Sequence, residues 1–77
     1  MQDTSTEERQ FTVSGDNIEL YKLLKLEGLC PSGGAAKLAI ADGQVRVDGE
    51  IETRKRKKIL PGQVVEFEAM RITLLSD

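Results

Sequence analysis

The fold is decided by residues 18–41, IELYKLLKLEGLCPSGGAAKLAIA. The first part of this stretch repeats apolar residues at helical spacing, which places them on one broad face. Lys22 and Lys25 fall together on another face, one turn apart. We therefore expect a helix over 18–27, ended by Gly28.

The second part of the stretch predicts another helix, over 33–41, with Ser32 as its N-cap. Leu38 and Ile40 supply bulk, and four small residues allow a second helix to approach closely. These are Ala35, Ala36, Ala39 and Ala41. Two helices joined by a few residues form a helical hairpin.

Upstream of the hairpin, residues 1–10 show no periodicity, and we expect a flexible tail. Phe11 and Val13 alternate with polar residues and indicate a short strand. Asp16 or Asn17 could cap the first helix.

Strand signals dominate the rest of the chain. Val45 and Val47 alternate with polar residues, and the Asp48-Gly49 pair that follows is a strong hairpin signal. A strict two-residue turn would put Ile51 on the face opposite the valines, whereas a bulge would put it with them, so the register stays open.

The C-terminal third predicts a turn and two more strands. Leu60-Pro61-Gly62-Gln63 fits a type II turn. Alternating apolar residues before and after it complete the pattern, namely Val65, Phe67, Ile72 and Leu74. The order of strand, two helices and several strands predicts one α+β domain over 11–77, a helical hairpin packed on a small, mostly antiparallel sheet.

Composition excludes several functional classes. The chain of 77 residues contains no histidine and one cysteine, Cys30. We therefore expect no disulfide, metal site, cofactor or enzymatic activity. No apolar run approaches a membrane span, and the polar N-terminus does not resemble a secretory signal, so we expect a cytoplasmic protein without membrane contact.

Charge is segregated along the chain. The net charge is −4 over residues 1–21, +4 over 22–58 and −2 over 59–77, which together give −2. A polyanion responds to the local positive segment and not to the average. With only three aromatic residues, recognition by stacked aromatics is not expected.

Two motifs could bind phosphate. Gly33 and Gly34 leave the backbone at the start of the second helix open, and Lys37 lies one turn further along the same face. The alternative is a tight turn beside a solvated lysine. Lys22 and Lys25 would matter only if the hairpin brings them beside Lys37.

The other motif is a run of five cations, which would repel one another without a polyanionic partner. It consists of Arg54, Lys55, Arg56, Lys57 and Lys58. In a strand, alternate members would face opposite ways. The alternative is a solvated loop or an edge strand protected by charge.

The spaced motifs together resemble the RNA-binding domain of the ribosomal small-subunit protein four type, here called the S-four domain, in its small stand-alone bacterial version. The resemblance runs from about Ile18 to Phe67. It is carried by Leu23–Leu29, Ser32–Lys37, Gly43–Glu50, Thr53-Arg54 and Lys58–Val65. The sequence departs from the family pattern at Gly33, Ala35 and Asp48, where many members have Arg, Glu and Asn.

The resemblance implies an L-shaped unit in which the second helix and the turn after the Val-x-Val strand face structured RNA. The matching residues are Ser32, Gly33, Gly34, Lys37, Arg46 and the basic residues from Arg54. We expect a non-catalytic monomer that binds structured RNA, ribosomal or transfer RNA among the candidates, with a ribosomal or protein partner possible.

Two alternatives from other classes remain. One is a protein-interaction adaptor whose basic run meets an acidic partner. The other is a sulfur-carrier-like domain of the β-grasp type, which is disfavoured because the sequence ends in Leu75-Ser76-Asp77 and not in Gly-Gly.

Overall fold

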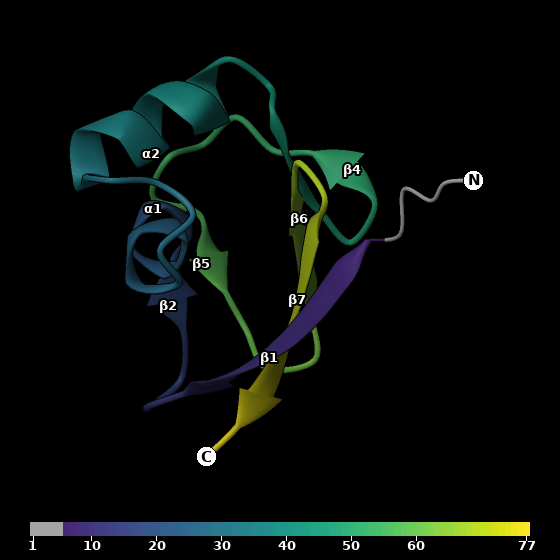
Figure 1. Cartoon of the computed structure of the whole chain (residues 1–77). Coiled ribbons are helices and arrows are strands. Elements are labelled where there is room, and N and C mark those ends of the chain that lie inside the picture. Colours follow the sequence, from purple (N-terminus) through teal and green to yellow (C-terminus); the bar gives the residue numbers. More distant parts are fainter. Residues whose placement is uncertain (1–5) are drawn as a thin grey trace.

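The computed structural model describes residues 6–77, and the chain forms two helices and two small sheets (Figure 1). The helices are α1 (Leu20–Leu26) and α2 (Gly33–Ala41). The strands are β1 (Glu7–Val13), β2 (Ile18–Glu19), β3 (Val45–Val47), β4 (Glu50–Ile51), β5 (Lys58–Ile59), β6 (Val64–Phe67) and β7 (Met70–Ser76).

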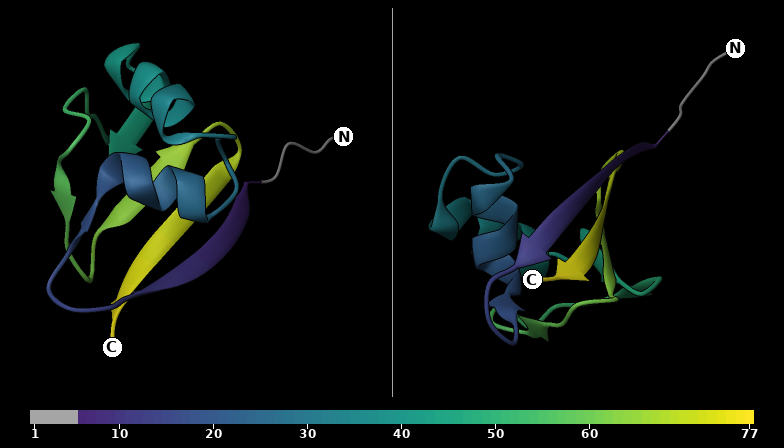
Figure 2. Two further views of the ribbon diagram at one scale, coloured as in Figure 1. Left: turned by 90° about the vertical axis from the view of Figure 1, so that its left-hand side faces the viewer. Right: turned by 90° about the horizontal axis from the view of Figure 1, so that it is seen from below.

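The larger sheet has the order β1-β7-β6-β3-β4 and is antiparallel except for the parallel pair β1–β7. β2 and β5 form a separate antiparallel pair. Both helices lie on one side of the larger sheet (Figure 2). The expected α+β arrangement of a helical hairpin on a small, mostly antiparallel sheet is therefore confirmed.

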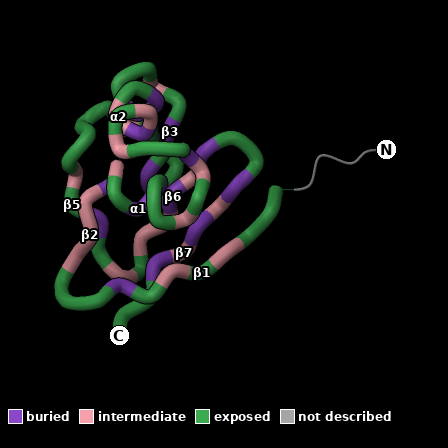
Figure 3. The backbone as a smooth tube through the Cα atoms, turned by 60° about the vertical axis from the view of Figure 1, so that its left-hand side comes forward, coloured by how far each residue is buried: buried purple, intermediate pink, exposed green. Residues whose placement is uncertain are grey.

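One hydrophobic core lies between the helices and the inner face of the sheet, and buried residues alternate with half-buried ones along most of β7 (Figure 3). Leu20, Leu23 and Leu24 enter it from α1, and Ala36 and Ile40 from α2. Leu38, which we expected to add bulk to the hairpin, is instead 69% exposed, because it lies on the outer side of α2.

The local signals at α2 and at the turns are confirmed. The Oγ of Ser32 accepts a hydrogen bond from the backbone N–H of Ala35 at 3.1 Å. At the Leu60–Gln63 turn, the N–H of Gln63 donates to the carbonyl of Leu60 at 3.1 Å, and Gly62 has φ +95°. These are the features of a type II turn.

The register between β3 and β4, which the sequence left open, is that of a two-residue turn. Val47 lies opposite Glu50 and Arg46 opposite Ile51. Asp48 and Gly49 both have positive φ, +53° and +87°, as a type I′ turn requires. Ile51 therefore points away from the buried valines and is 58% exposed.

The expected tail over residues 1–10 is wrong for Glu7 to Gln10, which belong to β1, while 1–5 lie outside the described residues. An edge strand needs backbone pairing and one half-buried face, and polar residues can supply both. Here the N–H of Glu7 donates to the carbonyl of Ala69 at 2.7 Å. Arg9 donates to the carbonyl of Glu27 at 2.9 Å.

The expected start of the first helix is also corrected. α1 begins at Leu20, its N-cap is Glu19, and no side chain caps it, so neither Asp16 nor Asn17 has that role. The first N–H groups of the helix donate instead to backbone carbonyls of the basic run. Leu20 bonds Lys57 at 2.9 Å, and Tyr21 bonds Lys55 at 3.2 Å.

Candidate nucleic-acid interface

The basic run forms an irregular loop before β5, so the strand-like alternation considered for it does not occur. Only Lys58 lies in a strand, opposite Glu19. Because the carbonyls of Lys55 and Lys57 accept the first N–H groups of α1, the loop is fastened to that end of the helix by its backbone. Apart from Arg54, none of its side chains forms a salt bridge within residues 6–77.

Tyr21 is the point where three chain segments meet. The Nζ of Lys37, from α2, lies 4.6 Å from the centroid of the Tyr21 ring. The guanidinium carbon of Arg56, from the basic loop, lies 5.7 Å from the same centroid. Both distances are within the range of cation–π attraction, so the ring holds two cations that are far apart in sequence.

Two more cations join this group from the outward face of α1. Lys22 and Lys25 line a hollow of about 260 Å³ together with Tyr21, Leu26 and Gly33. Lys22 also makes a long ion pair with Glu19, with 3.8 Å between Nζ and Oε1. We call Tyr21, Lys22, Lys25, Lys37 and Arg56 the Tyr21 cluster.

The start of α2 adds backbone donors beside this cluster. Gly33 and Gly34 occupy its first turn, where N–H groups have no acceptor within the helix. Ser32 differs from the two glycines because its hydroxyl already accepts the N–H of Ala35. The geometry therefore gives Ser32 a capping role in the described structure.

Arg54 pairs with Glu52 and is not part of the Tyr21 cluster. Its Nε and Nη2 donate to the two carboxylate oxygens of Glu52 at 2.9 and 3.1 Å. These bonds lower the pKa of the Glu52 carboxyl to about 2 and raise the pKa of the Arg54 guanidinium. The charge of Arg54 is therefore largely matched within the loop.

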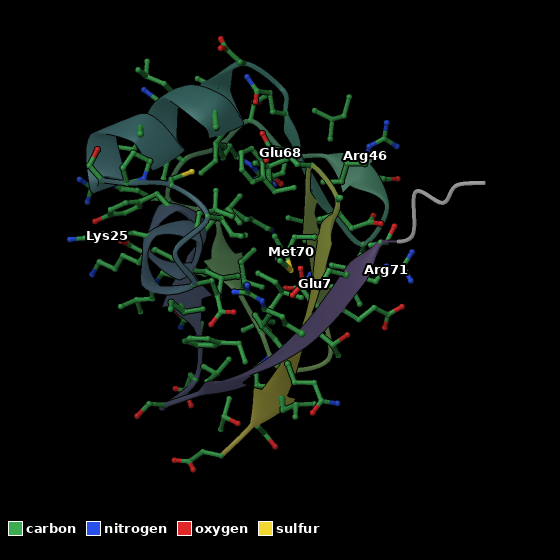
Figure 4. All side chains as sticks on the ribbon, in the orientation of Figure 1. Glu7, Lys25, Arg46, Glu68, Met70 and Arg71 are labelled. Atoms are coloured by element: carbon green, nitrogen blue, oxygen red, sulfur yellow. The ribbon has the colours of Figure 1, made fainter. Side chains whose placement is uncertain are left out.

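Arg46 lies on the outer face of the sheet, on the other side from the helices. Figure 4 shows its side chain far from that of Lys25. Arg46 is opposite Glu66 in the strand register, and Arg71 makes salt bridges with Glu66 at 3.4 Å and Glu8 at 3.2 Å. The structure thus places Arg46 in a row of alternating charges and not in the Tyr21 cluster.

Asp48 is positioned by the turn that follows β3. It accepts hydrogen bonds from the Gln63 amide at 2.8 Å and from the Val64 N–H at 3.0 Å. These bonds lower the pKa of the Asp48 carboxyl. Its negative charge therefore fastens the turn to the start of β6.

Sequence reasoning missed Tyr21 and Leu26 as members of this surface. The spacing of Tyr21 places it with the leucines on the apolar face of the first helix, yet it is only half-buried. Spacing was the signal that could have revealed them. Residues four apart share a helix face, which pairs Tyr21 with Lys25 and Lys22 with Leu26. The contributions of Lys37 and Arg56 depend on the tertiary fold.

Three further features bear on other classes of site. Among residues 6–77, no group of three or more carboxylate, thiol or imidazole side chains gathers in a way that could hold a metal ion. No described helix is long and apolar enough to cross a membrane. Cys30 is buried, and burial raises the pKa of its thiol.

Comparison with known proteins agrees with this fold. The sequence model of the S4 domain, the S-four domain above, matches residues 11–75. The chain is 53% identical over 60 residues to YbcJ of Escherichia coli (strain K12), named as a putative RNA-binding protein. This alignment covers 78% of this chain and 86% of YbcJ. It is also 35% identical over 57 residues to RlbA of Bacillus subtilis (strain 168), named as a probable ribosome maturation protein. That alignment covers 74% of this chain and 80% of RlbA.

A solved structure extends the likeness to three dimensions. The solution structure of YbcJ from E. coli, described as having an αL motif involved in RNA binding, matches with a TM-score of 0.66 at 45% identity. The match covers 97% of this chain and 91% of that chain. By sequence and by fold, the chain belongs to the S4 domain family.

Proposed function

We propose that the chain binds structured RNA through the Tyr21 cluster and the adjoining start of α2, without catalysing a reaction. One observation supports this most directly. Within residues 6–77, no carboxylate forms a salt bridge with Lys25, Lys37 or Arg56, although these cations come from three separate segments. Unmatched cations that converge on one surface favour a polyanionic ligand.

The form of the surface favours folded RNA over a flexible strand. Two of its cations, Lys37 and Arg56, are held against the Tyr21 ring, and backbone bonds fasten the basic loop to α1. A rigid array of phosphate contacts recognises shape, whereas single-strand binding depends on rows of aromatic side chains. The relatives described as an RNA-binding motif protein and a probable ribosome maturation protein support the same proposal, with ribosomal RNA as one candidate.

The role is binding and not chemistry because the sequence offers few groups for catalysis. It contains no histidine, and its one cysteine is buried with a raised thiol pKa. General acid–base or nucleophilic catalysis would need such groups exposed and activated.

A titration at several salt concentrations tests the proposal, with an RNA hairpin compared against a homopolymer strand of equal length. Four cations that each neutralise a phosphate predict a log–log salt slope of roughly −3 to −4 and tighter binding to the hairpin. A flat salt response, or tighter binding to the homopolymer, would contradict it. Displacement of the hairpin by polyglutamate at an equal charge concentration would favour the adaptor alternative.

A further inference from the structure

The hollow beside the Tyr21 cluster has an apolar interior and a charged rim. Its volume is about 260 Å³, which is below the range of about 300 to 1,000 Å³ for pockets that take drug-sized ligands. Tyr21 and Leu26 supply its large apolar side chains, and Gly33 also lines it. Lys22 and Lys25 complete it. The space suits one small planar group.

Gly33, the first residue of α2, borders the hollow. A Cβ on Gly33 would meet Cδ2 and Cε2 of Tyr21 at 3.6 Å, an ordinary van der Waals contact, so a longer side chain here would start at the wall of the hollow. Leu26 also lines the hollow, is 64% exposed and is not part of the buried core. Phosphate binding through the neighbouring lysines gives no use for an exposed leucine at this position.

We propose that the hollow takes one unpaired nucleobase of the bound RNA, with Lys22 and Lys25 beside the flanking phosphates. This inference rests on the proposed function. It adds which feature of a folded RNA the surface recognises, namely an unpaired base. A nucleobase has apolar faces and polar edges, but a continuous helix keeps those faces stacked inside. A bulged or looped-out base is the part of a folded RNA that presents such a face next to phosphates.

The experiment compares two RNA hairpins that differ only by one unpaired adenosine in the stem. The wild-type protein binds the bulged hairpin about five-fold or more tightly, the low end of what one base contact with an aromatic side chain contributes. Leu26→Ser removes one wall, and Gly33→Leu fills the hollow. Both variants lose the preference for the bulge, and Leu26→Ser, which removes no phosphate contact, still binds the uninterrupted hairpin.

Leu38→Ser is the matched control. Leu38 is the other strongly exposed helical leucine, at 69%, and it does not line the hollow. This variant keeps the wild-type preference. A thermal melt of each sample checks folding, and Leu26→Ser carries the test alone if Gly33→Leu is unstable.

Equal wild-type affinity for the two hairpins would overturn the base site while leaving the proposed function intact. Equal loss of preference in Leu26→Ser and Leu38→Ser would also overturn it, because the effect would then be general to exposed leucines. Absence of binding to either hairpin would remove the proposed function, and the base site with it.

Discussion

Two faces of this molecule carry exposed cations and hold them in different ways. On the outer face of the sheet, Arg71 lies between Glu8 and Glu66, and Arg46 lies opposite Glu66 in the next strand. On the helical side, the Tyr21 ring gathers cations from α2 and the basic loop, beside the lysines of α1. Alternating charges cancel within a few ångströms, whereas unmatched like charges add to a field that a polyanion can sense. The proposal of a binding surface on the helical side therefore rests on the arrangement of the cations and not on their number.

The largest expected effect comes from breaking the packing that assembles the helical face. Ala36 is fully buried in α2, and α1 and α2 pack against each other. Ala36→Leu should lower the free energy of unfolding by about 1–3 kcal/mol, because a filled core has no room for the added methylenes. Urea unfolding measures the loss.

Ala41→Leu is the control for that substitution, since Ala41 is exposed at the end of the same helix. Its effect should stay within about 0.5 kcal/mol. If the two variants unfold at the same urea concentration, the assigned packing of α2 is wrong.

An intermediate effect is expected when the two charged faces are neutralised in turn. Lys37→Ala with Arg56→Ala should weaken hairpin RNA binding roughly ten-fold at low salt and make the salt slope shallower by ~0.7 to 0.9 per lost contact. Arg46→Ala with Arg71→Ala removes the same number of cations from the sheet face and should leave the slope unchanged. Equal changes in both double variants would show that net charge, and not the Tyr21 cluster, governs binding.

The smallest expected effect concerns Glu52, whose carboxylate pairs with Arg54. The folded state lowers the pKa of the Glu52 carboxyl from its ordinary 4.5 to about 2. A lowered pKa contributes stability above the unfolded value and loses it as pH falls from about 4.5 towards about 2. Glu52→Gln should therefore flatten this part of the stability–pH curve in urea unfolding.

Glu50→Gln provides the comparison, because Glu50 is exposed and forms no salt bridge within the described part of the chain. Its stability should fall with acid as in the wild type. If the stability of Glu52→Gln falls between about pH 4.5 and 2 as steeply as that of the wild type, the Glu52–Arg54 ion pair contributes nothing to stability.

Prediction from sequence succeeded where the signal was local. The bounds of α2, the Ser32 cap and the turn at Leu60–Gln63 each depend on residues within a few positions of one another. It failed for Glu7 to Gln10, because this strand is held by parallel pairing with β7, far away in the sequence. The start of α1 was misplaced for a similar reason, since its N–H partners belong to the basic loop.

The sequence by itself determined the helical hairpin, the turns and the segregation of positive charge into residues 22–58. Hydrophobic periodicity, capping and turn chemistry act over a few residues, so they can be read along the chain. Only the tertiary structure decided which cations meet. It brought Lys37 and Arg56 to Tyr21, matched Arg54 with Glu52, and turned Arg46 to the far face of the sheet. The reason is that strand pleating and helix packing set side-chain direction through contacts between distant segments, which composition and spacing do not contain.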